Sequence, residues 1–75
     1  MIDIIRRIHR NVLKYGEGLT AQELATEIGQ QDQSIRLTLR RMLAQGLVRR
    51  AVGKSAVRDG LVYRWLATKK GEQWL

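Results

Sequence analysis

LTAQELATEIGQQDQSIRLTLRRMLAQGLV, residues 19–48, decides the fold, because it predicts two short helices joined by a tight turn. Thr20 is followed three residues later by Glu23, the spacing of a capping box, in which two otherwise unpaired backbone amides are satisfied at a helix start. Gly29 suits the left-handed conformation that ends many helices. We therefore predict a helix over residues 21–28.

The second helix of this stretch is predicted over residues 32–45, before Gly46. Ile35, Leu39, Met42 and Leu43 follow the spacing i, i+4, i+7 and i+8, which places them on one buried face. The opposite face and its edges are polar or basic apart from one leucine, and we expect them to be exposed. Their members are Gln33, Ser34, Arg36, Leu37, Arg40 and Arg41.

A further helix is predicted over residues 2–14 from apolar residues that recur at helical spacing. These are Ile2, Ile5, Ile8, Val12 and Tyr15. Arginines lie between them, so a helix resting on a membrane surface is an alternative. We favour a core helix, because a domain this small needs that apolar stripe to form its core.

The C-terminal part of the chain predicts a β-hairpin over residues 47–67. Two β-rich runs, 47–52 and 61–67, flank the polar, glycine-bounded segment GKSAVRDG. Asp59-Gly60 is itself suited to a tight turn, so the register of the two strands stays open.

The second strand alternates, and this places Tyr63 and Trp65 on one face. Stacking on single-stranded nucleic acid is one use for such aromatic side chains. We favour packing against the helices, because that face of the strand is expected to cover the core. Thr68 then caps a last short helical turn over residues 69–75.

Size and composition favour one small domain with a polyanionic partner. The chain has 75 residues and no cysteine, so we expect a reducing, cytoplasmic location and no disulfide. No apolar run is long enough to span a membrane, and no membrane partner is expected. The net charge of +7 is uneven: residues 33–71 hold ten basic side chains against one acidic, a net of +9, whereas residues 1–32 carry a net of −1. Such asymmetry is typical of a surface that binds a polyanion.

These elements resemble the winged helix-turn-helix superfamily over residues 2–71. LTAQELATEIG is similar to its supporting helix, and SIRLTLRRMLAQGLVRR is similar to its recognition helix running into the first wing strand. WLATKKG resembles the segment after the wing in multiple-antibiotic-resistance-type regulators, where the pattern is aromatic, any, Leu, Thr, any, any, Gly. Trp65, Thr68 and Gly71 match this pattern, and Ala67 replaces the usual leucine.

The resemblance implies an α+β fold in one domain over residues 1–75: a small winged helix-turn-helix with three helices, a two-stranded β-hairpin wing and a short C-terminal helical turn. It does not include the long dimerisation helices of those regulators, so dimerisation through such helices is not expected. Gln31-Asp32 replaces the common Ser-Pro start of the recognition helix. Leu37 stands where a polar or basic residue is more usual.

We expect the chain to bind double-stranded DNA as a transcriptional regulator, with the helix over residues 32–45 in the major groove. Gln33, Ser34 and Leu37 would face base edges, since glutamine pairs with adenine and leucine contacts a thymine methyl group. Arginines at the edges of that face would grip phosphate or read guanine, with phosphate favoured for at least two of the three. They are Arg36, Arg40 and Arg41.

Further backbone or minor-groove contacts are expected from the turn before this helix and from the wing tip at residues 53–60. The residues concerned are Gln30, Gln31, Lys54, Ser55 and Arg58. A symmetric homodimer on two half-sites, or a larger assembly with a protein partner, is compatible with so small a module.

The alternative is a winged-helix protein–protein interaction module, an adaptor or inhibitor, that uses the same exposed face around Leu37. Double-stranded RNA or non-B DNA is a weaker third ligand. No enzymatic activity is expected, because His9 is the only histidine and has no cysteine or carboxylate cluster around it. The sequence indicates no cofactor, metal or small-molecule substrate.

Overall fold

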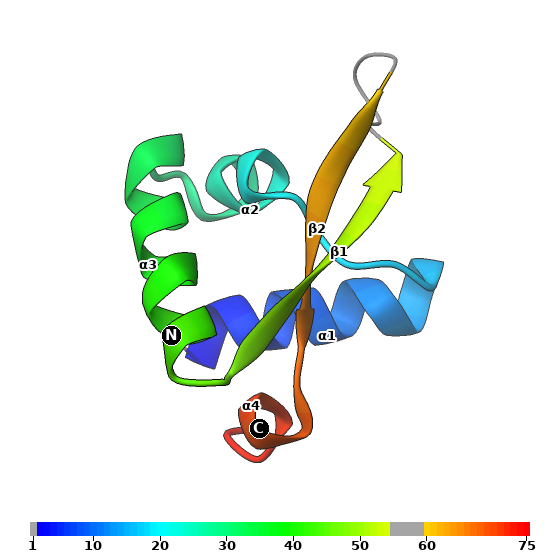
Figure 1. Cartoon of the computed structure of the whole chain (residues 1–75), viewed down its shortest axis with the longest axis vertical. Helices are drawn as coiled ribbons and strands as arrows, with labels where there is room; N and C mark the ends of the chain where they lie inside the picture. The colour runs from blue at the N-terminus through cyan, green and yellow to red at the C-terminus, as the bar shows by residue number, and fades with distance from the viewer. Residues whose placement is uncertain (1, 55–59) are drawn as a thin grey trace.

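The computed structural model describes residues 2–54 and 60–75, which form a small α+β fold with four helices and a two-stranded antiparallel sheet. In chain order the elements are α1 (Ile2–Tyr15), α2 (Ala21–Ile28), α3 (Asp32–Ala44), β1 (Val48–Lys54), β2 (Leu61–Ala67) and α4 (Lys69–Glu72). Figure 1 shows α2 and α3 on one side of the hairpin, α1 across its lower part and α4 near its foot. The predicted α+β class is confirmed.

The element boundaries differ slightly from those predicted. β1 runs to Lys54 instead of ending at residue 52, because Lys54 still pairs with Leu61 across the hairpin. The C-terminal helix is a single turn that ends at Glu72, with Gln73 as its cap. Within residues 2–54 and 60–75, no helix has both the length and the apolar character needed to cross a membrane.

The predicted capping box is present at the start of α2. The Glu23 amide donates to Thr20 Oγ1 at 3.0 Å, and the Thr20 amide donates to Glu23 Oε1 at 2.9 Å. Gly29 ends the helix with φ 80°, a conformation that is strained for residues with a side chain. Residues 29–31 then turn the chain directly into α3, and these local signals determine where α2 starts and ends.

The hydrophobic core is formed by one buried face of each of the three longer helices and by the base of the sheet. Its members are Ile4, Ile5, Ile8, Leu19, Leu24, Ala25, Ile35, Leu39, Met42, Leu47, Val48 and Trp65. The predicted apolar stripe of α1 was wrong at its two ends, since Ile2 and Tyr15 are exposed. Ile4, which was not part of that stripe, is buried. The core extends along only the middle of α1, so the ends of the helix project past it. Leu43 is only partly buried and packs against the edge of the core.

The strand register places β1 residues with even numbers and β2 residues with odd numbers on one face of the sheet. Arg50 pairs with Trp65, and Val52 pairs with Tyr63. The helices cover only the base of this face, so Trp65 is 7% exposed and Tyr63 is 57% exposed. The prediction that Tyr63 packs into the core was therefore wrong, because the hairpin projects beyond the helices (Figure 1).

Candidate nucleic-acid interface

α3 presents its polar and basic face to solvent. Gln33, Ser34, Arg36, Leu37, Arg40 and Arg41 are all exposed, as are Gln30 and Gln31 in the preceding turn. The face is polar except at its centre, where Leu37 is 51% exposed. The exposed surface predicted from the helical spacing of the sequence is thus present.

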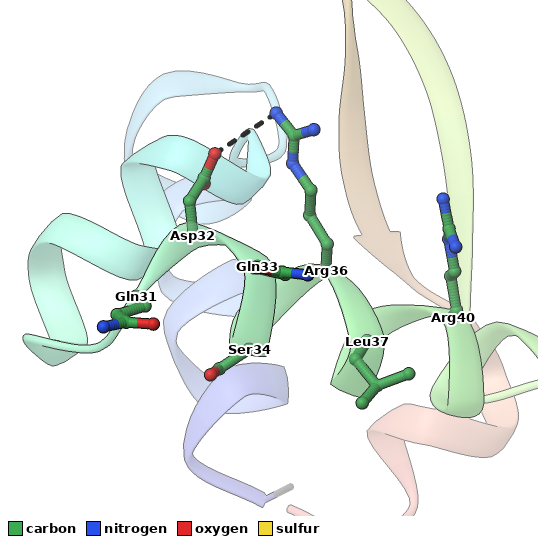
Figure 2. A pocket seen from close by; sticks show the side chains of 7 residues that line it. All are labelled: Gln31, Asp32, Gln33, Ser34, Arg36, Leu37 and Arg40. Atoms are coloured by element: carbon green, nitrogen blue, oxygen red, sulfur yellow. Dashed lines mark ion pairs between the residues drawn. The ribbon is translucent and has the colours of Figure 1, made fainter.

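An open hollow of about 730 Å³ lies over the first three turns of this face. Figure 2 shows that Arg36 and Arg40 extend from α3 to the same side, while Ser34 and Leu37 extend to the other. The lining residues are Gln31, Asp32, Gln33, Ser34, Arg36, Leu37 and Arg40. A ligand seated here would meet guanidinium groups along one edge and short polar or aliphatic groups along the other.

Asp32 is the one acidic side chain that lines this hollow. Its Oδ2 lies 3.2 Å from Nη2 of Arg36, one turn further along the helix (Figure 2). Its Oδ1 is buried and has no hydrogen-bond partner among the residues that the structure describes. The carboxylate complements the amino-terminal end of the helix dipole, and it also restrains Arg36 and lowers the positive potential of the hollow.

A second hollow of about 330 Å³ separates α3 from the exposed part of the sheet. Arg36 and Arg40 line it as they line the first hollow, so the two hollows share one edge of α3. Its remaining lining residues are Ala21, Gln22, Arg50, Val62, Tyr63 and Trp65. Three arginines, two from α3 and one from β1, therefore border a single hollow.

Arg50 is a candidate binding residue that sequence reasoning did not select. Its guanidinium carbon lies 4.9 Å from the centre of the Tyr63 ring and 5.7 Å from the centre of the Trp65 ring. Such stacking holds an arginine in place while its N–H groups stay available. Alternation along β1 could have placed Arg50 on this face, but only the strand register brings it beside both aromatic rings.

Some predicted contact residues do not join this group. Arg41 is exposed but lines neither hollow, because one residue after Arg40 the side chain is turned by about 100° around the helix axis. Lys54 is the last residue of β1, and its side chain is outside the described part of the structure. Ser55 and Arg58 also lie outside the described residues, so the wing-tip contacts stay a prediction.

Ion pairing leaves the positive charge of this surface largely uncompensated. Every acidic side chain that the structure describes has a basic neighbour within ion-pair distance: Asp3 and Glu27 with Arg7, Glu17 and Glu23 with Arg64, Asp32 with Arg36, and Glu72 with His9. Among the described residues, no carboxylate lies within that distance of Arg40, Arg41 or Arg50. The same part of the chain contains no cluster of three or more histidine, cysteine or acidic side chains suited to a metal ion.

Comparison of the chain with known protein families, with curated proteins and with solved structures finds no match. The chemistry of the surface is therefore judged from its geometry and charge. They show an exposed helix face and a neighbouring strand that present Arg40, Arg41 and Arg50 with no acidic partner among the described residues.

Proposed function

We propose that this chain is a winged helix-turn-helix protein that binds double-stranded DNA and regulates transcription in the cytoplasm of its cell. α2, the turn at residues 29–31 and α3 correspond to the helix-turn-helix, and β1 with β2 corresponds to the wing. α3 lies in the major groove, where a helix fits and base edges are readable.

The observation that carries this proposal is the grouping of Arg36, Arg40 and Arg50 around one hollow beside α3. Arginine binds phosphate oxygens through its planar set of N–H donors, and Arg40 and Arg50 have no carboxylate partner among the described residues. Phosphate contacts from these side chains would hold α3 in the groove, since most protein–DNA hydrogen bonds go to the backbone.

Base contacts are assigned to the exposed centre of α3. Gln33 is suited to pairing with adenine, Ser34 can hydrogen-bond to more than one kind of base, and Leu37 is suited to contact with a thymine methyl group. Lys54, Ser55 and Arg58 of the wing tip are assigned to the backbone or the minor groove. With six or more phosphates neutralised, affinity should fall by roughly 10³–10⁵ between about 50 and 200 mM salt.

A titration of the protein with random-sequence duplex DNA at two salt concentrations tests the proposal. The double variant Arg40→Gln/Arg50→Gln should bind roughly tenfold more weakly and lower the salt slope by about 1.8, at about 0.9 for each lost phosphate contact. The matched control is Arg49→Gln/Lys69→Gln, which removes the same charge from exposed positions that line neither hollow. Wild-type protein that fails to bind duplex at low salt would exclude DNA binding.

A protein-binding role for the same face is favoured by one observation, the exposure of Leu37 at its centre. Leu37→Gln separates the two functions when it is combined with selection of binding sites from a random duplex pool. On DNA, the substitution should change the preferred base at one position and leave non-specific affinity intact. An unchanged selected sequence would point to a protein partner for Leu37.

A further inference from the structure

The outer face of α1 carries a row of basic side chains: Arg6, Arg10 and Lys14. All three are exposed, and they follow one another at intervals of four residues. At about 100° per residue, they span about 80° of the helix circumference. The centre of the row is opposite the buried face formed by Ile4, Ile5 and Ile8. The row therefore points directly away from the core.

These charges are not compensated within the described part of the chain. Three acidic side chains pair with other residues of α1: Asp3 and Glu27 lie 3.1 and 3.6 Å from Arg7, and Glu72 lies 3.8 Å from His9. Among the described residues, no acidic side chain lies within that distance of Arg6, Arg10 or Lys14. Lys14 lies over the ring of Tyr15, 5.2 Å from its centre, and remains exposed.

Such a row lowers the stability of the free protein. Like charges four residues apart on a helix repel one another by about 0.2–0.5 kcal/mol per pair, and the row contains two such pairs. An ordinary solvated helix face alternates charges of opposite sign instead. A polyanion bound along the row would turn this repulsion into attraction.

The dimensions of the row fit a DNA backbone. Four helical residues rise about 6 Å, so the row is about 12 Å long. One strand of duplex DNA presents a phosphate for about every 3.4 Å along the helix axis, so several phosphates lie within that length. A membrane surface fits less well, because an interfacial helix inserts its apolar face and α1 uses that face in the core.

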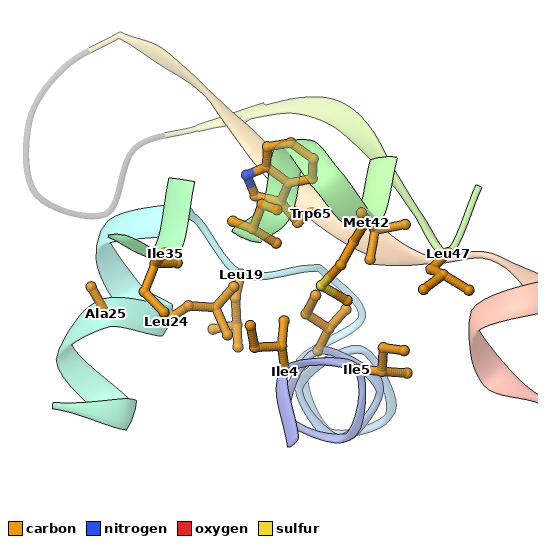
Figure 3. Close-up of a cluster of buried hydrophobic side chains, with 12 residues drawn as sticks. Ile4, Ile5, Leu19, Leu24, Ala25, Ile35, Met42, Leu47 and Trp65 are labelled. Atoms are coloured by element: carbon orange, nitrogen blue, oxygen red, sulfur yellow. The ribbon is translucent and has the colours of Figure 1, made fainter. Parts of the chain in front are cut away.

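The row and the proposed DNA-reading face of α3 are on different sides of the molecule. Figure 3 looks along α1 and shows the buried cluster on one side of the helix only. α3 buries Ile35, Leu39 and Met42 in that same cluster. Each helix therefore turns its outer face away from the core that the two helices share.

We propose that the row of Arg6, Arg10 and Lys14 is a second duplex-DNA backbone site, so that one molecule joins two DNA segments. This inference rests on the proposed function for its first segment. The second contact is sequence-independent, because cations that contact only phosphates do not read base edges. The activity is thus DNA bridging in addition to DNA recognition.

A bead-capture assay with the full chain tests this inference. One duplex is immobilised, protein is added to saturation, and retention of a second, labelled random-sequence duplex is measured. The triple variant Arg6→Gln/Arg10→Gln/Lys14→Gln should bind single duplexes within about threefold of wild type but lose retention of the second duplex. The matched control Arg49→Gln/Lys69→Gln/Lys70→Gln removes the same charge and should retain it.

The outcomes separate this inference from the proposed function. Retention that survives in the α1 triple variant, or that is lost equally in the matched control, would overturn the α1 site. Binding of the α1 row to anionic phosphatidylserine vesicles and not to the second duplex would overturn it in favour of a membrane. If Arg40→Gln/Arg50→Gln leaves duplex affinity unchanged while the α1 triple variant abolishes it, the proposed role of α3 fails, the α1 row still binds DNA, and bridging by one molecule is excluded.

Discussion

Nη1 of Arg64 lies 2.9 Å from Oε1 of Glu23, and this ion pair joins two residues that are 41 positions apart in the chain. The same Glu23 oxygen accepts the Thr20 amide of the capping box at 2.9 Å. Arg64 also donates to the Gly18 carbonyl oxygen at 3.0 Å and is only 6% exposed. One buried arginine therefore joins the start of α2 to the middle of β2.

Arg64→Gln should lower the free energy of unfolding by about 3 kcal/mol, because it leaves Glu23 and the Gly18 carbonyl without their buried cationic partner. Chemical denaturation followed by circular dichroism measures this loss. Arg49→Gln, an exposed arginine on the neighbouring strand, should change the same free energy by less than about 0.5 kcal/mol. Equal effects of the two substitutions would mean that the ion pair contributes nothing to stability.

Gly18→Ala should destabilise the fold more than Gly16→Ala. A Cβ at Gly18 would collide with the carbonyl oxygen of Trp65, so the backbone contact beside the Leu19–Trp65 bridge must open. We expect the free energy of unfolding to fall by about 3 kcal/mol, the upper end of the range for overpacked substitutions. At Gly16 a Cβ meets no atom of the described residues within 4 Å, and only the φ of 77° opposes alanine, at about 1 kcal/mol. Thermal unfolding of both variants tests which substitution destabilises more. A larger loss of stability in Gly16→Ala than in Gly18→Ala would contradict the prediction.

Asp32→Asn should tighten duplex DNA binding. The substitution removes the carboxylate from the hollow over α3 and releases Arg36, now held at 3.2 Å, for contact with phosphate. One screened charge at close range is worth about 1 kcal/mol, or roughly a fivefold gain in affinity at low salt. Fluorescence anisotropy with a labelled duplex measures the gain, which should shrink as salt is added. Weaker binding would show that Asp32 helps to position α3 on DNA.

Tyr63→Ser should weaken DNA binding roughly threefold, because the stack that holds Arg50 contributes about 0.5–1 kcal/mol at an exposed site. Tyr63→Phe keeps the aromatic ring and should bind like wild type. Leu61→Ser is the matched control. Leu61 is exposed on the same strand face as Tyr63, but it has no aromatic ring on which Arg50 could stack. Parallel titrations of the three variants measure the effect, and equal losses in Tyr63→Ser and Leu61→Ser would argue against the stack.

Sequence alone located the helices and the exposed face of α3. The capping box at Thr20 and Glu23, the left-handed Gly29 and the apolar spacing of Ile35, Leu39 and Met42 are local signals, and each acts within a few residues of the chain. The arginines opposite that buried stripe were therefore identifiable as surface groups before any coordinates.

Only the tertiary structure decided which side chains from distant segments meet. The hairpin register brought Arg50 onto the Tyr63 and Trp65 rings, and the packing of β2 against the loop before α2 buried Arg64 beside Glu23. Tertiary packing also placed Glu27 beside Arg7 and Glu17 beside Arg64, so that no acidic side chain of the described residues lies within ion-pair distance of Arg6, Arg10 or Lys14. Such pairings depend on strand register and on how far the helices reach along the sheet. Both are set by contacts between residues far apart in the chain, which local spacing does not encode.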